Sequence, residues 1–101
     1  MKPVRFAPLA SREVAATASE YEEKAPGLGQ KFISEVETAT EQLAQFPDSA
    51  PRFGARLRRK LLKRFPFALL YSARDEVVWI VAVMHQSRGP TFIAKRLKGH
   101  E

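Results

Sequence analysis

The hydrophobic pattern of this chain changes period at residues 47–51, and this change limits what the chain can fold into. Before it, apolar residues recur every three or four positions, which predicts one face of an α-helix: Leu28, Phe32, Val36, Ala39, Leu43 and Phe46. After it, leucine alternates with basic residues over residues 56–62, which is typical of a β-strand. Pro47 stops the helix, because proline cannot continue one. The chain is therefore predicted to place helices first and strands afterwards.

A second helical stripe precedes residue 28. Its apolar and small residues share one face: Leu9, Ala10, Val14, Thr17, Ala18 and Tyr21. Pro8 suits a first helical turn, and Pro26-Gly27 ends the helix. Residues 4–6 form a short strand candidate. Two helices joined by a Pro-Gly turn predict an antiparallel helical hairpin.

Two further strands are predicted at residues 65–71 and 77–84, joined by a polar turn at residues 72–76. Residues 91–97 fit a short helix or a strand, and residues 98–101 are expected to fray. With 101 residues, the chain is expected to form a single domain over residues 1–101. The predicted class is α+β with the order β-α-α-β-β-β, a helical hairpin packed on an antiparallel sheet.

The segment Val77–Met84 is apolar on both sides, which is typical of a central strand covered on both faces. The predicted helices cover only one face. We therefore expect a partner to cover the other, because a large exposed apolar surface is uncommon on a monomer. A strongly curved sheet with a small second core is the alternative. Trp79 is expected to pack in the core rather than to stack on nucleic-acid bases.

The composition narrows the class of protein. The chain has no cysteine, which excludes a disulfide framework and a thiolate metal site. It has no metal-ligand spacing and no Gly-rich phosphate loop, so neither a metal nor a cofactor is expected. The first residues lack the apolar run of a signal peptide, and the longest apolar run is too short to span a membrane. A cytoplasmic protein is expected.

The positive charge lies in the second half. The net charge is +6, of which residues 1–46 contribute −2 and residues 47–101 contribute +8. Seven basic residues occur between positions 52 and 64 with no acid among them: Arg52, Arg56, Arg58, Arg59, Lys60, Lys63 and Arg64. Such an asymmetry favours an anionic partner, such as nucleic acid or an acidic protein.

Several short segments carry a resemblance to a known family. They are Phe6–Ala10, Gly27–Phe32, Arg64–Phe67 and His85–Pro90, the last followed by Phe92 and Arg96. In their order and spacing, residues 4–96 resemble the RelE/ParE superfamily of bacterial toxins, in particular its ParE-like and plasmid-stabilisation branch. No single segment is specific, but their succession along almost the whole chain is.

The resemblance implies the toxin of a type II toxin–antitoxin system. Its partner would be a cognate antitoxin, which wraps an otherwise disordered segment along the sheet and the helices. The basic residues would then bind the antitoxin, the toxic target, or both: Arg56, Arg58, Arg59, Lys60, Arg64, Arg88 and Arg96.

The resemblance leaves two targets open. ParE-like members poison DNA gyrase, whereas RelE-like members cut mRNA in the ribosomal A site. RNA cleavage needs a base, cations that stabilise the charged phosphorane, and an acid. If the chain is a nuclease, His85, Arg88 and Arg64 are the expected catalytic residues. Phe92 stands where many nuclease members have a tyrosine, and it cannot donate a proton.

Gyrase inhibition without enzyme activity is therefore the favoured hypothesis. Ribosome-dependent mRNA cleavage is the alternative. A non-toxic basic nucleic-acid-binding module is a third.

Overall fold

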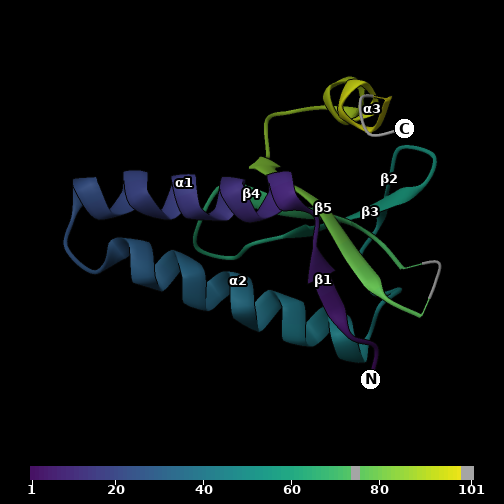
Figure 1. Ribbon diagram of the computed structural model, residues 1–101, viewed down its shortest axis with the longest axis horizontal. Helices are drawn as coiled ribbons and strands as arrows, with labels where there is room; N and C mark the ends of the chain where they lie inside the picture. Colours follow the sequence, from purple (N-terminus) through teal and green to yellow (C-terminus); the bar gives the residue numbers. More distant parts are fainter. Residues whose placement is uncertain (74–75, 99–101) are drawn as a thin grey trace.

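A helical hairpin lies against one face of a five-stranded sheet in the computed structural model, which describes residues 1–73 and 76–98 (Figure 1). The elements in chain order are β1 (Val4–Phe6), α1 (Pro8–Lys24), α2 (Leu28–Gln45), β2 (Arg52–Phe53), β3 (Leu57–Leu61), β4 (Phe67–Ser72), β5 (Val78–His85) and α3 (Pro90–Lys98). The α+β class, the helical hairpin and the three-strand meander are confirmed. Of the polar turn predicted at residues 72–76, Arg74 and Asp75 lie outside the described residues, as do 99–101 of the predicted fraying end.

The sheet is mixed rather than purely antiparallel. Its strand order is β1-β5-β4-β3-β2, and β1 runs parallel to β5, with Val4 opposite Val78 and Phe6 opposite Ile80. The prediction of an antiparallel sheet is correct for β2 to β5 and wrong for β1. A three-residue strand carries too short a pattern to indicate its partner, and the helical hairpin returns the chain so that β1 and β5 point the same way.

The main core lies between the helical hairpin and the sheet. Its largest fully buried side chains are Phe32, Leu43, Leu69, Tyr71, Val78 and Ile80. The hairpin is closely packed where α1 crosses the start of α2. There, the Glu22 carboxylate accepts hydrogen bonds from the N–H groups of Gly27 and Gly29 at 2.8 and 3.0 Å. A negative charge at this position stabilises the start of α2, because the first amides of a helix have no partner within it.

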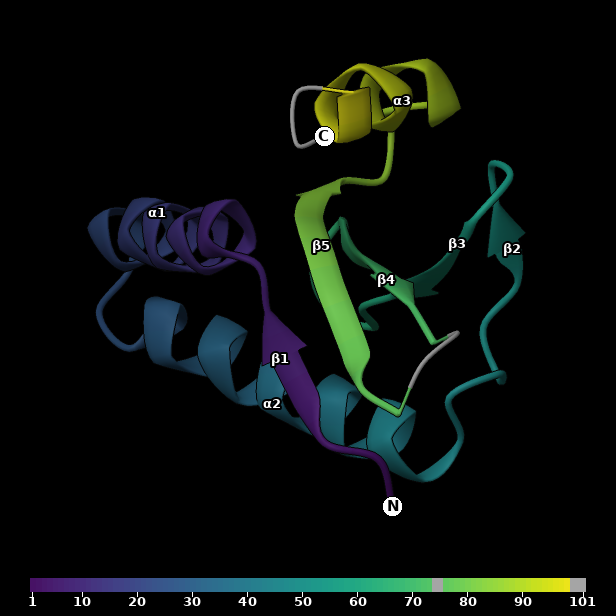
Figure 2. The same ribbon diagram turned by 45° about the vertical axis from the view of Figure 1, so that its right-hand side comes forward.

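Part of the second face of the sheet is covered by α3, which lies beyond the end of β5 and away from α2 (Figure 2). Ile93 of α3 joins a small second core with Leu57, Leu70, Ala82 and Met84. The alternative of a small second core is therefore correct for this part of the face, because residues 91–97, open between helix and strand, form an amphipathic helix that packs on it. Trp79 lies on the same face and stays exposed, so the expected partner for the rest of the face stays a prediction.

One ion pair ties α3 to the rest of the molecule. Arg96 donates from Nη1 to Glu13 Oε2 at 2.7 Å and from Nη2 to Glu13 Oε1 and Val81 C=O at 3.1 and 3.0 Å. Glu13 Oε1 also accepts the Val83 N–H at 2.9 Å. Beyond the end of β1, the Val81 carbonyl and the Val83 N–H at the outer edge of β5 are thus hydrogen-bonded to side chains instead of to a neighbouring strand.

Trp79 does not pack in the core. It is 40% exposed and pairs with Arg5 of β1, which is also exposed. The core on this stretch of β5 is made by its neighbours Val78 and Ile80, which point to the opposite face.

Candidate binding surfaces

The basic strand β3 distributes its cations over both faces of the sheet, as the alternation predicts. Arg58 and Lys60 lie opposite Tyr71 and Leu69 of β4, whose side chains belong to the core under the helices. Arg59 lies opposite Leu70, which belongs to the second core, and its guanidinium is 4.7 Å from the centre of the Phe53 ring. A single partner cannot engage all of these cations from one side.

A first candidate surface is a hollow at the β2–β3 hairpin, which we call the arginine pocket. It has a volume of about 320 Å³ and is lined by Asp48, Arg52, Ala55, Arg56, Leu57, Arg58 and Ala73. Arg58 Nη1 donates to the Ala50 carbonyl at 2.8 Å, and its Nε lies 3.7 Å from Asp48 Oδ1. Cross-strand pairing places Arg52 directly opposite Arg58. Three arginines therefore line one mainly polar hollow.

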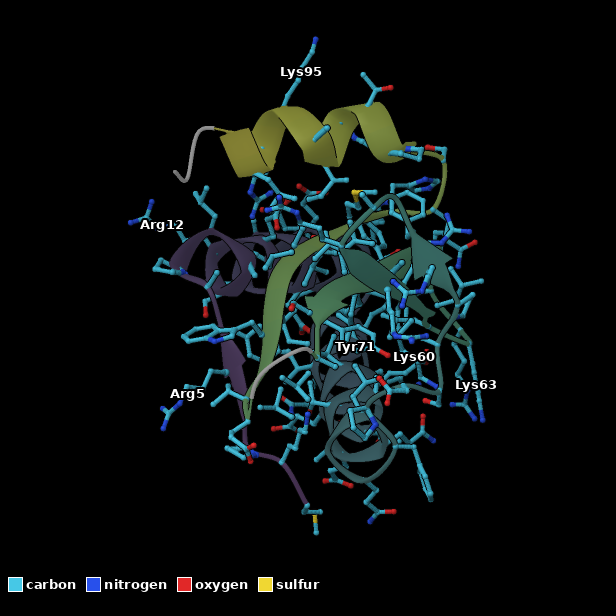
Figure 3. All side chains as sticks on the ribbon, turned by 90° about the vertical axis from the view of Figure 1, so that its right-hand side faces the viewer. Arg5, Arg12, Lys60, Lys63, Tyr71 and Lys95 are labelled. Atoms are coloured by element: carbon cyan, nitrogen blue, oxygen red, sulfur yellow. The ribbon has the colours of Figure 1, made fainter. Side chains whose placement is uncertain are left out.

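A second candidate surface is a groove along α2, which we call the α2 groove. It has a volume of about 780 Å³ and a mainly apolar lining from Leu28 and Phe65, with Lys31, Lys63 and Arg64 also lining it. The Glu35 carboxylate accepts the backbone N–H groups of Lys63 and Arg64, which fixes the β3–β4 connection against α2. In Figure 3, Lys60 and Lys63 lie on one flank of the molecule, and Arg5 and Arg12 lie on the other.

The residues expected to serve a nuclease do not share a hollow among the described residues. His85 lies at the end of β5, where its Nδ1 accepts the Ser87 N–H at 3.1 Å, and it lines a small hollow with Glu20 and Tyr21. The Arg88 guanidinium lies 4.4 Å from the centre of the Phe92 ring. Arg64 lines the α2 groove.

The two tyrosines do not supply a general base. Tyr71 is fully buried and donates to the Pro47 carbonyl at 2.8 Å, and burial raises the pKa of its hydroxyl. Burial, and then the charge of Glu20, also raises the pKa of Tyr21. A raised pKa keeps a phenol protonated, so neither tyrosine serves as a base near neutral pH.

Arg96, expected on the binding surface, has its guanidinium bound to Glu13 and Val81, and its side chain is only 12% exposed. It belongs to the packing of α3. Arg56 and Arg64, by contrast, are exposed, and Arg58, Arg59 and Lys60 are partly exposed.

Sequence reasoning passed over Arg52 and Glu35 as site residues. Gly54 could have indicated the first, because it has a φ of 76° and forms the turn that brings Arg52 against Arg58. Nothing in the sequence around Glu35 signals its contact with residues 28 positions later.

Within residues 1–73 and 76–98, no group of three or more histidine, aspartate or glutamate side chains is placed to hold a metal ion. None of the helices in this part of the chain is long and apolar enough to cross a membrane.

The fold and its exposed cations define a small basic α+β protein. A family model described as the ParE toxin of the type II toxin–antitoxin system parDE matches residues 4–90, and the chain belongs to this family. A solved structure titled as the chromosomal ParDE toxin–antitoxin system from P. aeruginosa contains a similar chain. It has 16% sequence identity and a TM-score of 0.73, with 84% of this chain and 96% of that chain covered. No curated protein matches the chain.

Proposed function

We propose that this toxin acts in the cytoplasm by poisoning DNA gyrase, and that a cognate antitoxin neutralises it. The observation that carries the choice of target is Phe92. Its ring packs against Arg88 and has no hydroxyl group, whereas the resemblance to nuclease members of the superfamily implies a proton-donating tyrosine near this end of the domain. The separation of His85, Arg88 and Arg64 into different hollows supports the same choice.

The target is tested with two assays run on the same preparation of toxin. We expect the toxin to inhibit supercoiling by purified gyrase and to increase the amount of cleaved, gyrase-bound DNA. We expect no ribosome-dependent cleavage of mRNA. Rapid cleavage of A-site codons without any effect on gyrase would overturn the proposal.

For the antitoxin, the α2 groove offers a site in which an amphipathic acidic segment would bury its apolar side against Leu28 and Phe65. Its carboxylates would pair with Lys31, Lys63 and Arg64 at the rim. The other exposed or partly exposed cations are candidates for binding either the antitoxin or the toxic target: Arg56, Arg58, Arg59, Lys60 and Arg88.

The antitoxin site is tested by reversing charge on one flank at a time. Lys63→Glu should weaken antitoxin binding by about tenfold or more, because it replaces attraction with repulsion at the groove. Arg12→Glu, the same change on the opposite flank, should have little effect. Equal losses for both variants would show that only the overall charge matters and would remove the α2 groove from the proposal.

The nuclease alternative rests on His85, which is exposed and shares a hollow with Tyr21 and Glu20. If the toxin cleaves mRNA, His85→Ala should abolish cleavage while the melting temperature stays unchanged. Full cleavage by that variant would remove His85 from the mechanism.

A further inference from the structure

The β2–β3 hairpin holds two like charges directly against each other. Arg52 and Arg58 are cross-strand partners, and like charges in this position destabilise a sheet. Arg56, from the turn of the same hairpin, lines the same hollow. A local arrangement that opposes stability is expected where function requires it.

The protein's own groups compensate this charge only in part. Asp48 is the acid in the lining, but its side chain is 77% exposed and its nearest oxygen lies 3.7 Å from Arg58 Nε. Arg58 is further held by its bond to the Ala50 carbonyl. Among residues 1–73 and 76–98, the side chains of Arg52 and Arg56 have no hydrogen-bond or ion-pair partner. Among the described residues of the lining, three positive charges therefore stand against one negative charge.

The shape and lining of the arginine pocket favour a small, strongly charged group. Ala55 and Ala73 contribute short side chains to a hollow of about 320 Å³, and most of its lining is polar. An amphipathic peptide would find no apolar surface here comparable to that of the α2 groove. Planar guanidinium groups bind phosphate oxygens in pairs, which suits a phosphate better than a buried peptide.

We propose that the arginine pocket binds a backbone phosphate of double-stranded DNA, so that the toxin contacts DNA in addition to gyrase. This inference rests on the proposed function and deepens it. It divides the basic residues between two ligands: Arg52, Arg56 and Arg58 hold DNA, and the α2 groove holds the antitoxin. Binding to a phosphate carries no base readout, so the affinity for DNA is independent of sequence.

The direct test is the binding of a short DNA duplex to the purified toxin, measured by fluorescence anisotropy over a range of salt concentrations. The variant Arg52→Gln/Arg56→Gln should bind about tenfold more weakly or worse to duplexes of every sequence. The slope of log affinity against log salt should decrease in magnitude by about 0.9 for each phosphate that the variant no longer neutralises. Both arginines are exposed, so the variant should fold, with a melting temperature at or above that of the wild type because the repulsion between Arg52 and Arg58 is removed.

The matched control is Arg5→Gln/Arg12→Gln, which removes the same charge outside the arginine pocket, with Arg5 on the edge strand of the sheet opposite to that of Arg52. This control should retain most of the DNA affinity. An equal loss in the two double variants would mean that only net charge attracts DNA, and would overturn the inference. An unchanged DNA affinity in Arg52→Gln/Arg56→Gln would overturn it as well.

Two further measurements separate the possible ligands. Inorganic phosphate, titrated into the toxin and followed by NMR, should shift the Arg52 and Arg56 side-chain signals and should compete with the duplex. Antitoxin affinity should be the same for the wild type and for Arg52→Gln/Arg56→Gln. A loss of antitoxin affinity with unchanged DNA affinity would reassign the pocket to an acidic protein segment and overturn the inference.

The gyrase assay keeps this inference separate from the proposed function. Wild-type toxin that leaves gyrase unaffected contradicts the proposed function, whatever its affinity for DNA. The inference alone is contradicted by a different result. In that case the wild-type toxin traps gyrase, and the Arg52→Gln/Arg56→Gln variant traps gyrase and binds DNA equally well.

Discussion

At Gly29, the two helices of the hairpin approach so closely that no side chain fits between them. A Cβ atom added there would lie 2.4 Å from the Ala18 carbonyl oxygen. We expect Gly29→Ala to lower the free energy of unfolding by about 1–3 kcal/mol, because the helices must separate to accept the methyl group. Urea denaturation measures this change.

Gly89→Ala is the matched control, because a Cβ at this position would meet nothing within 4 Å. Its effect should stay within about 0.5 kcal/mol. Equal effects of the two substitutions would show that the closeness of the helices at Gly29 does not limit stability.

Tyr71 joins the core to the loop that leaves α2 through its hydrogen bond to the Pro47 carbonyl. Tyr71→Phe should cost about 1 kcal/mol at neutral pH, because it leaves that carbonyl without its partner. Burial raises the pKa of Tyr71 above its ordinary value of 10.0, so the folded state retains a proton that the unfolded state loses.

The stability that this raised pKa contributes should therefore be complete below pH 10.0 and should fall as the pH rises above it. Urea titrations at a series of alkaline pH values measure the slope. Tyr71→Phe cannot ionise, so its slope should be smaller, with the remainder partly due to Tyr21. The same slope in both proteins would contradict the assignment to Tyr71.

At the scale of the element, α3 depends on the pair formed by Arg96 and Glu13. The Glu13 carboxylate accepts hydrogen bonds from the Arg96 guanidinium and from the Val83 N–H, and both bonds are partly buried. Glu13→Ala removes both of them. We expect a loss of about 3 kcal/mol in the free energy of unfolding and faster hydrogen exchange in α3.

Glu23→Ala, which removes an exposed acid from the same helix α1, is the control and should change stability little. Replacing both partners, as in Glu13→Met/Arg96→Met, should recover much of the loss, because no buried charge is then left alone. A double variant as unstable as the sum of the single variants would contradict the coupling between the two residues.

The elements also show which parts of the fold the sequence can predict. The helical period of residues 28–46 and the apolar run of residues 77–84 are local patterns, and both indicated the correct element. The parallel pairing of β1 and the cover by α3 depend on contacts between distant residues, such as Val4 with Val78 and Glu13 with Arg96.

The same limit applies to the candidate binding surfaces. Local patterns in the sequence predicted part of them, and contacts between distant residues determined the rest. The alternation in β3 correctly separated Arg58 and Lys60 from Arg59, because it depends only on strand geometry. The side chain of Arg96 is chemically the same as those of the exposed arginines. It differs because the fold places it against Glu13, which is 83 residues away in the sequence. The exposure of Trp79 was likewise not visible, because apolar residues flank it on both sides in the sequence.

For the whole molecule, the net charge of +6 should act against compactness. Raising the salt concentration from about 10 mM to about 150 mM shortens the screening length from about 30 to 8 Å. We expect a rise in melting temperature over this range, measured by circular dichroism. The Arg52→Gln/Arg56→Gln variant, with two fewer positive charges, should show a smaller rise. A fall in melting temperature with salt would mean that attractive ion pairs dominate.

The parallel pairing of β1 with β5 has a consequence for how the protein is made. Residues 4–6 leave the ribosome well before their partners at residues 78–80 are synthesised. The bond from Arg96 to Glu13 must wait still longer. The centre of the sheet therefore closes only after β5 has emerged, and a translation product that stops before β5 lacks the strand on which both cores are built. Truncated products of a growth-arresting protein are then unable to adopt its fold.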